Sequence, residues 1–425
     1  MDPVETNAPA EAAAAPAPHD PLAALRSRDF RLLAGGTFLA VMGEQMVNVA
    51  VGWELYERTR SPLALGLVGL VQLLPVLLLA LPAGHLADRL DRRRIGVATM
   101  AGLALAMLGL ALASSAGAPL PLLYLCLLAI GVGRAFQSPA LAALTAQVVP
   151  PVHFGNAATW ESSVWQASAI LGPALGGFLI AARHGAAPVY AIAAGMLLLT
   201  AVLLARLRLR QAARLAETAT LSEVLAGMRF IWNTKVILAA LTLDMVAVLL
   251  GGATALLPIF ARDILQVGAQ GLGWLRAAPP AGAVVAALLL AVLPPFKRAG
   301  RTLLLVVAGF GLATIVFGLS RSFPLSLLML ALVGGLDNIS VVIRGTLVLT
   351  RTPDALRGRV NAAHFVFIGI SNELGAFESG VAAEWLGPVG AVVAGGIGTI
   401  LVALLVALKW PEMRRLGRLD TGHTP

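Results

Sequence analysis

The chain has 425 residues, which in a soluble protein would correspond to two to four domains. Hydrophobic residues make up 58% of it, charged residues only 12%, and the mean hydropathy is +0.84. Soluble chains carry about 25% charged residues, so most of this chain must face a lipid bilayer. The net charge of +9 does not indicate nucleic-acid binding, because the basic residues lie in short gaps between apolar runs.

Residues 1–25 are expected to form a disordered cytoplasmic tail. The first twenty residues are rich in Ala and Pro and contain four acids but no Lys or Arg, the opposite of a signal peptide's basic start. The single cysteine, Cys126, lies inside an apolar segment and is interpreted as a packing residue. We therefore expect no disulfide and no metal site.

Twelve apolar segments are each long enough to cross a bilayer, which takes roughly 20 helical residues. The first six lie near 30–53, 63–83, 95–115, 119–144, 157–182 and 187–205. The second six lie near 236–260, 271–293, 302–320, 325–349, 361–386 and 389–408. The pattern predicts an all-α membrane protein of twelve transmembrane helices in two six-helix bundles, over residues 26–206 and 236–410, followed by a cytoplasmic tail over 411–425.

Residues 207–235 form the predicted cytoplasmic linker between the bundles. Apolar residues from Leu221 to Ile231 recur at roughly helical spacing, which predicts an amphipathic helix lying on the membrane surface.

The distribution of Lys and Arg predicts the orientation. With both termini inside, 23 of the 31 basic residues fall in cytoplasmic segments, five in external gaps and three within spans. Positively charged loops remain in the cytoplasm, so we expect a multi-pass protein of the bacterial cytoplasmic (inner) membrane with both termini cytoplasmic.

The two halves also resemble one another. The segment Gly172 to Gly177 in the fifth span aligns with Gly375 to Gly380 in the eleventh, 203 residues later. A parallel repeat of six spans places a substrate site near the membrane midplane between the halves.

The loop between the second and third spans reads GHLADRLDRRRI from Gly84. It resembles the signature loop of the major facilitator superfamily, with Asp91 where that family has glycine. The resemblance implies a gating loop in which the aspartate meets the start of the eleventh span, not a catalytic site. Its residues here are Gly84, Asp88, Arg89, Arg92 and Arg93.

Two further motifs resemble those of proton-coupled antiporters in the same superfamily. Arg134 and Gln137 in the fourth span match an R-x-x-Q pattern, with Ser138 in place of its last glycine. Gly172, Pro173, Gly176 and Gly177 in the fifth span match the antiporter motif. The resemblance implies export, and a second interpretation, in which the glycines only pack helices, stays open.

The segments SRDFR from Ser27, TPDALRGRVN from Thr352 and SNELGAFESG from Ser371 carry a more specific resemblance. They are similar to the branch of the superfamily that contains enterobactin exporters and the related transmembrane secretion effectors. The resemblance covers nearly the whole chain after residue 25, and it indicates the fold and branch more than the substrate.

Ionisable residues inside the spans are functional candidates, because each costs about 2.5–3.5 kcal/mol to insert at a span centre. There are six acids and three bases, so some acids must remain neutral or titrate. The acids are Glu44, Glu161, Asp244, Asp337, Glu373 and Glu378, and the bases are Arg134, Arg276 and Arg344.

Glu44 and Asp244 lie in the first and seventh spans, which are equivalent in the repeat and line the central cavity in the family. Both are candidates for proton coupling, and replacing Asp244 by Asn is expected to abolish coupled efflux and leave folding intact. Glu373 and Glu378 are candidates as well. They point in different directions on their helix, so one is expected to face the cavity and the other to meet Arg134 or Arg344.

The remaining polar residues of the spans are predicted to line the cavity or to bind at the interface. Arg134, Gln137, Asp337, Asn338 and Asn372 are assigned to the cavity and its charge partners. Arg344 either forms an ion pair or extends to the interface. Glu161, Trp160 and Trp165 are interpreted as an interfacial belt.

No ATP-binding motif and no membrane-protease or zinc pattern occurs, so an enzyme is not expected. The predicted function is proton-coupled export of an amphipathic small molecule, such as a siderophore, drug or secreted metabolite, by alternating access. Its partners are the bilayer, protons and the substrate; we expect a monomer that needs no cofactor beyond the proton gradient. An uptake symporter or a lipid flippase on the same fold is the alternative.

Overall fold

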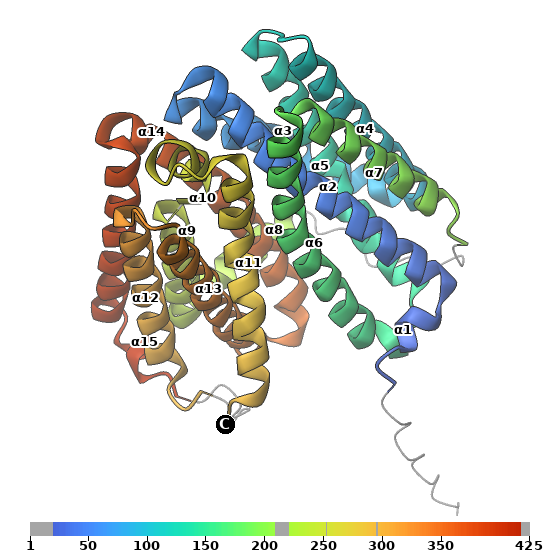
Figure 1. Cartoon of the computed structure of the whole chain (residues 1–425). Helices are drawn as coiled ribbons and strands as arrows, with labels where there is room; N and C mark the ends of the chain where they lie inside the picture. Colours follow the sequence, from blue (N-terminus) through green and yellow to red (C-terminus); the bar gives the residue numbers. More distant parts are fainter. Residues whose placement is uncertain (1–19, 209–220, 252, 295, 418–425) are drawn as a thin grey trace, which may run out of the picture.

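The computed structural model describes residues 20–208, 221–251, 253–294 and 296–417 (Figure 1), and within those ranges the chain is helical, with no strand. The first group of membrane-spanning helices comprises α2 (Arg28–Thr59), α3 (Pro62–Arg89), α4 (Arg92–Ser115), α5 (Leu120–Val148), α6 (Phe154–Arg183) and α7 (Ala187–Ala205). The second comprises α9 (Lys235–Leu250) with α10 (Ala253–Ile259), α11 (Gly268–Val292), α12 (Ala299–Leu319), α13 (Phe323–Arg351) and α14 (Asp354–Lys409).

The described residues contain eleven helices long and apolar enough to cross a membrane, and the last of them, Phe367–Lys409 with 43 residues, is long enough for two crossings of roughly 20 residues each. Helix α14 is interrupted at Gly387, where φ is 73° and ψ is 161°. Glycine adopts this conformation without steric cost, and Pro388 follows without a backbone N–H. The break lies between the two predicted spans, so the predicted twelve-helix architecture is confirmed.

The seventh span differs from the single uninterrupted helix that was predicted. Helix α9 ends with Gly251 as its C-cap, α10 resumes at Ala253, and the π-helix η2 (Phe260–Ile264) closes the span. Pro258 lies just before η2 and cannot donate a helical hydrogen bond. Hydropathy alone does not detect the breaks near Gly251 and Pro258, because the neighbouring residues of α9 and α10 are mostly apolar.

The helices form two groups that lie side by side, α1 to α7 and α8 to α15 (Figure 1). The groups contact each other mainly through α3 against α14 and α6 against α11. Glycines make both contacts close. A Cβ built on Gly177 would lie 2.5 Å from the Ala269 carbonyl oxygen, and one built on Gly66 would lie 3.0 Å from the Gly380 Cα.

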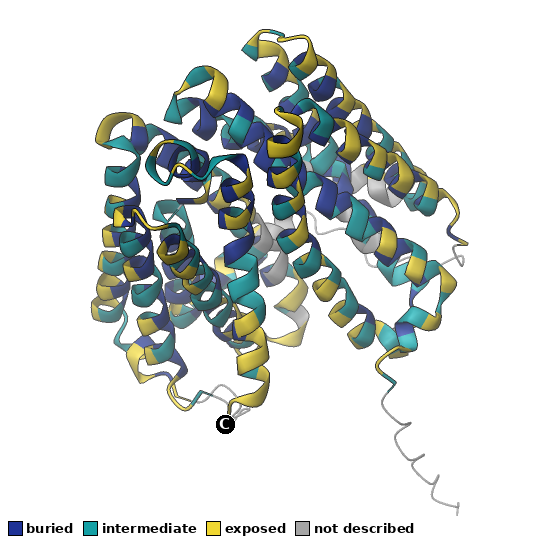
Figure 2. Ribbon diagram, viewed as in Figure 1, coloured by how far each residue is buried: buried dark blue, intermediate teal, exposed yellow. Residues whose placement is uncertain are grey.

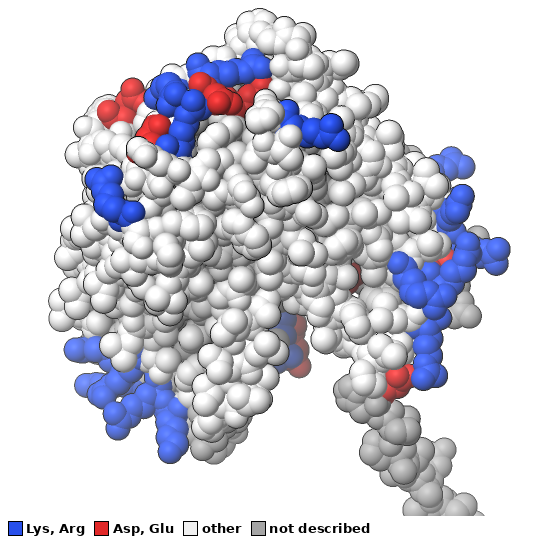
Figure 3. Space-filling view, viewed as in Figure 1, with Lys and Arg blue, Asp and Glu red and all other residues white. Residues whose placement is uncertain are grey.

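The two halves converge at one end of the bundle and separate at the other. The end that carries residues 20 and 417 is called here the terminal side (Figure 1). The close glycine contacts lie toward the opposite side, near the end of α6 and the start of α11. Figure 3 shows the surface hollowed between the halves at the terminal side.

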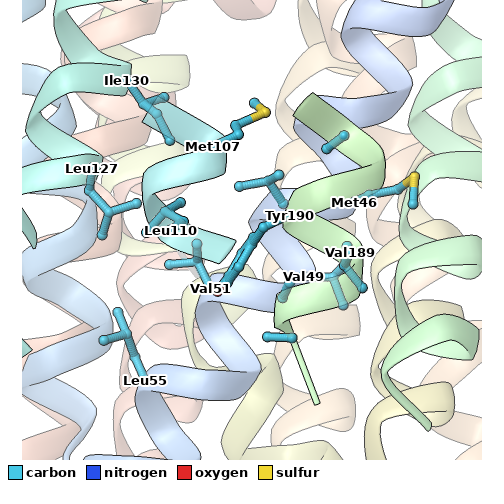
Figure 4. Packing of buried hydrophobic residues seen from close by; sticks show 14 of the residues in the cluster. Met46, Val49, Val51, Leu55, Met107, Leu110, Leu127, Ile130, Val189 and Tyr190 are labelled. Atoms are coloured by element: carbon cyan, nitrogen blue, oxygen red, sulfur yellow. The ribbon is translucent and has the colours of Figure 1, made fainter. Parts of the chain in front are cut away.

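The buried core follows the same arrangement. The largest cluster of buried apolar residues joins the two halves, and its aromatic pair Phe260 and Phe317 has ring centroids 4.7 Å apart. Figure 4 shows part of this cluster around Tyr190, where side chains of Met46, Val49, Met107 and Leu110 pack together. Many of the exposed large apolar residues are leucines, as expected of a surface in contact with lipid, and Figure 2 shows exposed residues along the outer helices.

The linker helix α8 (Leu221–Asn233) forms as predicted, and its position on the membrane surface stays a prediction. It packs on α14 and α9, with Ile231 buried beside Val360 and Ile237. A Cβ on Gly227 would lie closer to the Arg359 carbonyl oxygen than atoms can approach. Trp232 remains 71% exposed, so only part of the apolar surface of α8 is free for lipid.

Most of the predicted N-terminal tail, residues 1–19, lies outside the described residues. The rest of it is ordered. Helix α1 (Ala23–Arg26) sits on the start of α6, where the Asn156 Nδ2 donates to the Pro21 carbonyl at 2.7 Å and the Ala24 amide donates to Asn156 Oδ1 at 3.0 Å. The last described residue of the predicted 411–425 tail is Gly417, and α15 (Pro411–Arg415) precedes it.

Replacing Gly177 by Ala is expected to destabilise the protein by about 1–3 kcal/mol, because the new methyl group has no room between α6 and α11. Gly195→Ala in α7 is the matched control, since nothing lies within 4 Å of a Cβ there. Thermal unfolding of the purified variants measures the difference. Equal melting temperatures for the two variants would contradict the close contact.

Candidate functional site

A cavity of about 730 Å³ lies between the two halves. Helices α2 and α6 supply its lining on one side, and α10, α11, α13 and α14 supply the other. A smaller chamber of about 220 Å³ shares four of the lining residues, namely Asn48, Thr254, Arg276 and Asn372. The two chambers therefore adjoin, at the place where the repeat predicted a substrate site.

Arg134 stands beside the smaller chamber between carboxylates of both halves. Its guanidinium lies 3.8 Å from Glu44 of α2 and 3.8 Å from Glu373 of α14. It also donates to the Gln72 Oε1 at 2.8 Å, and Gln137 donates to Glu44 at 2.6 Å. The cluster contains two carboxylates and one guanidinium, and Glu373 is its contribution from the second half.

From the sequence, one of Glu373 and Glu378 was expected to face the cavity and the other to meet an arginine. In the structure, Glu373 does both. Glu373 lines the chamber and also lies beside Arg134. The expectation that one acid faces the cavity while the other meets an arginine was therefore wrong. Glu378, five residues later, is half-buried nearer the opposite side.

Asp244 forms an ion pair with Arg344 within the second half, and both side chains are buried. The alternative in which Arg344 extends to the membrane interface is wrong, since its side chain is only 4% exposed. The pair joins α9 to α13, and the Glu44–Arg134 pair joins α2 to α5. These helices occupy equivalent places in the repeat, so the two halves each have a carboxylate–arginine pair at the corresponding place.

Asp337, Asn338 and Asn372 all line the larger cavity. Helix α13 is continuous through this stretch, so the polar residues line the cavity without a break in the helix. Gly334 lies so close to Pro279 of α11 that a Cβ would overlap its carbonyl oxygen. That contact fixes Asp337 and Asn338 beside α11.

The interpretation of Trp165 as part of an interfacial belt is wrong. Its side chain lines the larger cavity and is 51% exposed there. Trp160 instead donates to the Pro21 carbonyl at 3.0 Å, and Glu161 accepts a hydrogen bond from Thr145 at 2.5 Å. The sequence places all three near one helix end, but helix rotation decides which of them faces the cavity.

A cluster of ion pairs closes the opposite side, and it was not predicted from the sequence. Tyr56 donates a short hydrogen bond to Asp263, which also pairs with Arg60 at 3.2 Å. Arg262 pairs with Glu57 at 3.1 Å and lies 5.7 Å from the Trp53 ring centroid. These contacts join the end of α2 to η2 and hold the two halves together at that side.

Glu54 was missed because the first span was predicted to end at residue 53. The side chain is 6% exposed, accepts from the Tyr190 hydroxyl at 2.8 Å and pairs with Arg58 at 2.5 Å. The spacing of Glu54 and Arg58, four residues apart, is the signal that could have extended the predicted helix.

The predicted gating loop is described only in part. The surroundings of Gly84 and the side chains of Asp88 and Arg89 are outside what the structure describes, so their predicted role stays a prediction. Arg93 donates to the Leu207 carbonyl at 3.1 Å, and Arg92 is half-buried. Asp91, the departure from the family pattern, accepts from the Arg93 amide at 2.9 Å and caps the start of α4.

The predicted antiporter motif packs α6 between two helices. A Cβ on Gly172 or Gly176 would meet the backbone of α2 at Met42 or Met46, whereas Gly177 faces α11. Pro173 lines the larger cavity. Gly375 faces the backbone of α9 and Gly380 faces α3, so the repeat-related glycines make equivalent contacts in the two halves.

The Major Facilitator Superfamily model matches residues 33–376. The chain belongs to the major facilitator superfamily. Two curated relatives are the enterobactin exporter EntS of Escherichia coli O1:K1 and that of Shigella boydii serotype 18. Each is 27% identical over 394 residues, an alignment that covers 91% of this chain and 92% of the relative.

Solved structures share the fold. One is a bacterial homologue of the human lysosomal transporter Spinster in an inward-facing, unoccupied conformation, with a TM-score of 0.71 and 15% identity over 93% of this chain and 98% of that one. Another is a POT-family transporter in complex with 5-aminolevulinic acid, with a TM-score of 0.69 and 12% identity over 91% and 97%. The chain is thus a multi-pass membrane transporter of this superfamily.

The Asp263→Asn variant is expected to open the side opposite the termini about tenfold more often. It weakens the contacts of both Tyr56 and Arg60, and hydrogen bonds to charged groups contribute about 1.5–3 kcal/mol each. A cysteine at Thr254, introduced with Cys126→Ala, reports the opening by its rate of reaction with a membrane-impermeant thiol reagent. Asp354→Asn, in an exposed pair on the terminal side, is the control. Unchanged labelling in Asp263→Asn would show that these contacts do not gate the cavity.

Proposed function

We propose that the protein is a proton-coupled exporter of an amphipathic small molecule, such as a siderophore, a drug or a secreted metabolite. The observation that carries the proposal is the Arg134 cluster. One guanidinium stands between two carboxylates, and one of these comes from the other half of the molecule. A single positive charge cannot neutralise both acids, and a proton is the ligand that balances the second.

The distribution of basic residues supports the assignment of the terminal side to the cytoplasm of a bacterial cell. On that assignment the hollow between the halves opens inward, and the Tyr56–Asp263 cluster closes the cavity toward the exterior. A substrate made or accumulated in the cell would therefore meet an open site. The exporters among the relatives support the same direction.

Alternating access requires that the contacts on one side break as those on the other form. We propose that Glu373 couples this change to a proton, and its ion pair with Arg134, which crosses between the halves, supports this role. Protonation removes the charge that holds this pair and so changes the relative stability of the two conformations. A bound proton shifts the equilibrium between the two conformations only because it binds them with different affinity.

The proposal extends to the residues whose roles stay predictions. Asp88 and the arginines of the loop after α3 would make the corresponding gate on the cytoplasmic side. Asp244 is proposed as a second titrating group, Gln137 and Asn372 as polar lining of the path, and Glu378 as the alternative proton carrier. The protein would act as a monomer, driven by the proton gradient with no further cofactor.

Inside-out membrane vesicles test the proposal. Their lumen corresponds to the cell exterior, so an exporter should concentrate its substrate inside when the lumen is acidified. The panel is a set of labelled siderophores, dyes and macrolides, with vesicles that lack the protein as the control. Accumulation that a protonophore abolishes is the expected result. Transport in the same direction as the proton would instead favour a symporter, and lipid scrambling without solute transport would favour a flippase.

A further inference from the structure

Arg276 of α11 faces both chambers of the central cavity, and no hydrogen bond or ion pair links it to any other described residue. Its Nε is buried without a partner. The other two arginines inside the spans are both paired, Arg134 with Glu44 and Glu373 and Arg344 with Asp244. Of the three arginines inside the spans, Arg276 therefore has no counter-charge from the described part of the chain.

A guanidinium inside a span without a counter-charge is costly, and such residues usually mark the path of a ligand or ion. Asp337 lines the same cavity, but no ion pair joins it to Arg276 within the described residues. Arg276 therefore provides an anion-binding position inside a cavity that opens between the halves. Guanidinium groups bind carboxylates, phenolates and phosphates through charge-assisted hydrogen bonds.

Two further polar atoms in the same cavity have no partner. Gln166 Oε1 of α6 and Asn338 Oδ1 of α13 are both buried and unbonded within the described residues. Buried polar groups are nearly always satisfied, so water or a ligand must fill this role. Because both atoms are acceptors, a complementary ligand presents hydroxyl or N–H donors to them, one toward each half.

The lining also contains other polar side chains (Gln45, Asn48, Thr254, Asp337 and Asn372) and an aromatic and apolar part. Trp165 presents a half-exposed indole, and Pro173, Pro279 and Pro280 lie around the same space. An indole face stacks with flat rings. A volume of about 730 Å³ is within the range of sites that hold drug-sized ligands.

We propose that the cavity recognises a flat, hydroxylated or amide-bearing organic anion, whose negative group binds Arg276 and whose ring system packs against Trp165. The inference rests on the proposed function and names the class of its substrate. Trp165 lies eleven residues from the start of α6 on the terminal side, whereas Arg276 lies eight residues from the start of α11 on the opposite side. The anionic end of the substrate thus occupies the closed end of the cavity.

Binding to the purified full-length protein in detergent, measured by isothermal titration calorimetry, tests the site without any proton gradient. The probes are 3-hydroxy-2-naphthoate and its neutral amide, which share one ring system and one hydroxyl and differ in charge. We expect the acid to bind roughly 10- to 100-fold more tightly than the amide, the range that a charge-assisted hydrogen bond supplies.

Three variants separate charge from packing. Arg276→Gln should remove the preference for the acid, and Arg276→Lys should retain most of it. Trp165→Leu should weaken both probes by the same factor and leave their ratio unchanged. Arg321→Gln, on an exposed residue outside the cavity, is the control. Thermal unfolding of each variant establishes that it is folded.

Equal affinity of the acid and the amide for the wild-type protein would overturn the proposal. So would an acid preference that survives Arg276→Gln, or no measurable binding of the acid to folded wild-type protein. These outcomes leave proton-coupled export untouched, because vesicle accumulation measures it separately. Conversely, acid binding that depends on Arg276 would stand even if no export were found.

Discussion

Replacing Asp244 by Asn is expected to lower the free energy of unfolding by about 3–5 kcal/mol. Asp244 pairs with Arg344, and their side chains are only 10% and 4% exposed. The substitution removes the negative charge and leaves a buried guanidinium uncompensated. On the sequence alone this substitution was expected to leave folding intact, and the burial of the pair is the reason for the new expectation. Thermal unfolding of the purified protein measures the effect.

A double variant provides the control for that experiment. Asp244→Leu combined with Arg344→Met replaces both charges by apolar groups of similar size, a change that is often neutral or stabilising for a buried pair. It should therefore recover most of the stability that Asp244→Asn loses. A single variant that melts at the wild-type temperature would contradict the buried pair. A double variant that is no more stable than the single one would show that the loss of stability comes from packing and not from charge.

The Glu373→Gln variant is expected to lower substrate-coupled proton flux at least tenfold while the protein remains folded. Glutamine keeps the size of the side chain and can still accept from Arg134, but it cannot carry a proton. Without an exchangeable proton at the contact between the halves, the proton gradient cannot favour one conformation over the other. Proton flux into proteoliposomes and substrate binding are measured on the same preparation, and binding should be retained.

Glu378→Gln is the matched control, because this acid lies on the same helix and was a candidate of equal rank on the sequence. Its substrate-coupled proton flux should remain within a few-fold of the wild type, because Glu373, and not Glu378, lies against Arg134. The reverse pattern, with coupling lost in Glu378→Gln and kept in Glu373→Gln, would assign the proton to the other acid. Equal coupling in both variants and the wild type would remove both from the mechanism.

The fold was predictable because lipid imposes a simple constraint on each span. A helix that satisfies its own backbone hydrogen bonds and carries about 20 apolar residues is the expected solution, and the predicted segments agree with the observed helices. Helix ends were less predictable. Helix α2 runs on to Thr59, six residues past the predicted end, because Glu54 and Arg58 continue the helix as an ion pair.

The ionisable residues of the site were found from the sequence, but their partners were not. Which arginine meets which acid depends on how each helix is rotated about its axis. Span composition does not contain that information. The pairing of Arg134 with acids from both halves, and the burial of Arg344, therefore required the structure.

The roles of Arg276 and Trp165 also could not be predicted from the sequence. Arg276 was identified as a base within a span, yet its lack of a partner is a property of the assembled cavity. Trp165 lies in a segment whose composition suits an interfacial belt as well as a cavity wall. Only the contact between α6 and the second half distinguishes the two.

In the proposed function, substrate and protons cross the membrane in opposite directions and their movements are coupled. Purified protein in liposomes with a pH-sensitive dye trapped inside tests it most directly, with an imposed proton gradient and a panel of siderophores, dyes, macrolides and hydroxylated aromatic acids. We expect a proton flux that begins when one class of compound is added and that is abolished in the Glu373→Gln variant. A substrate transported across the same membrane with no change in the dye signal would contradict it.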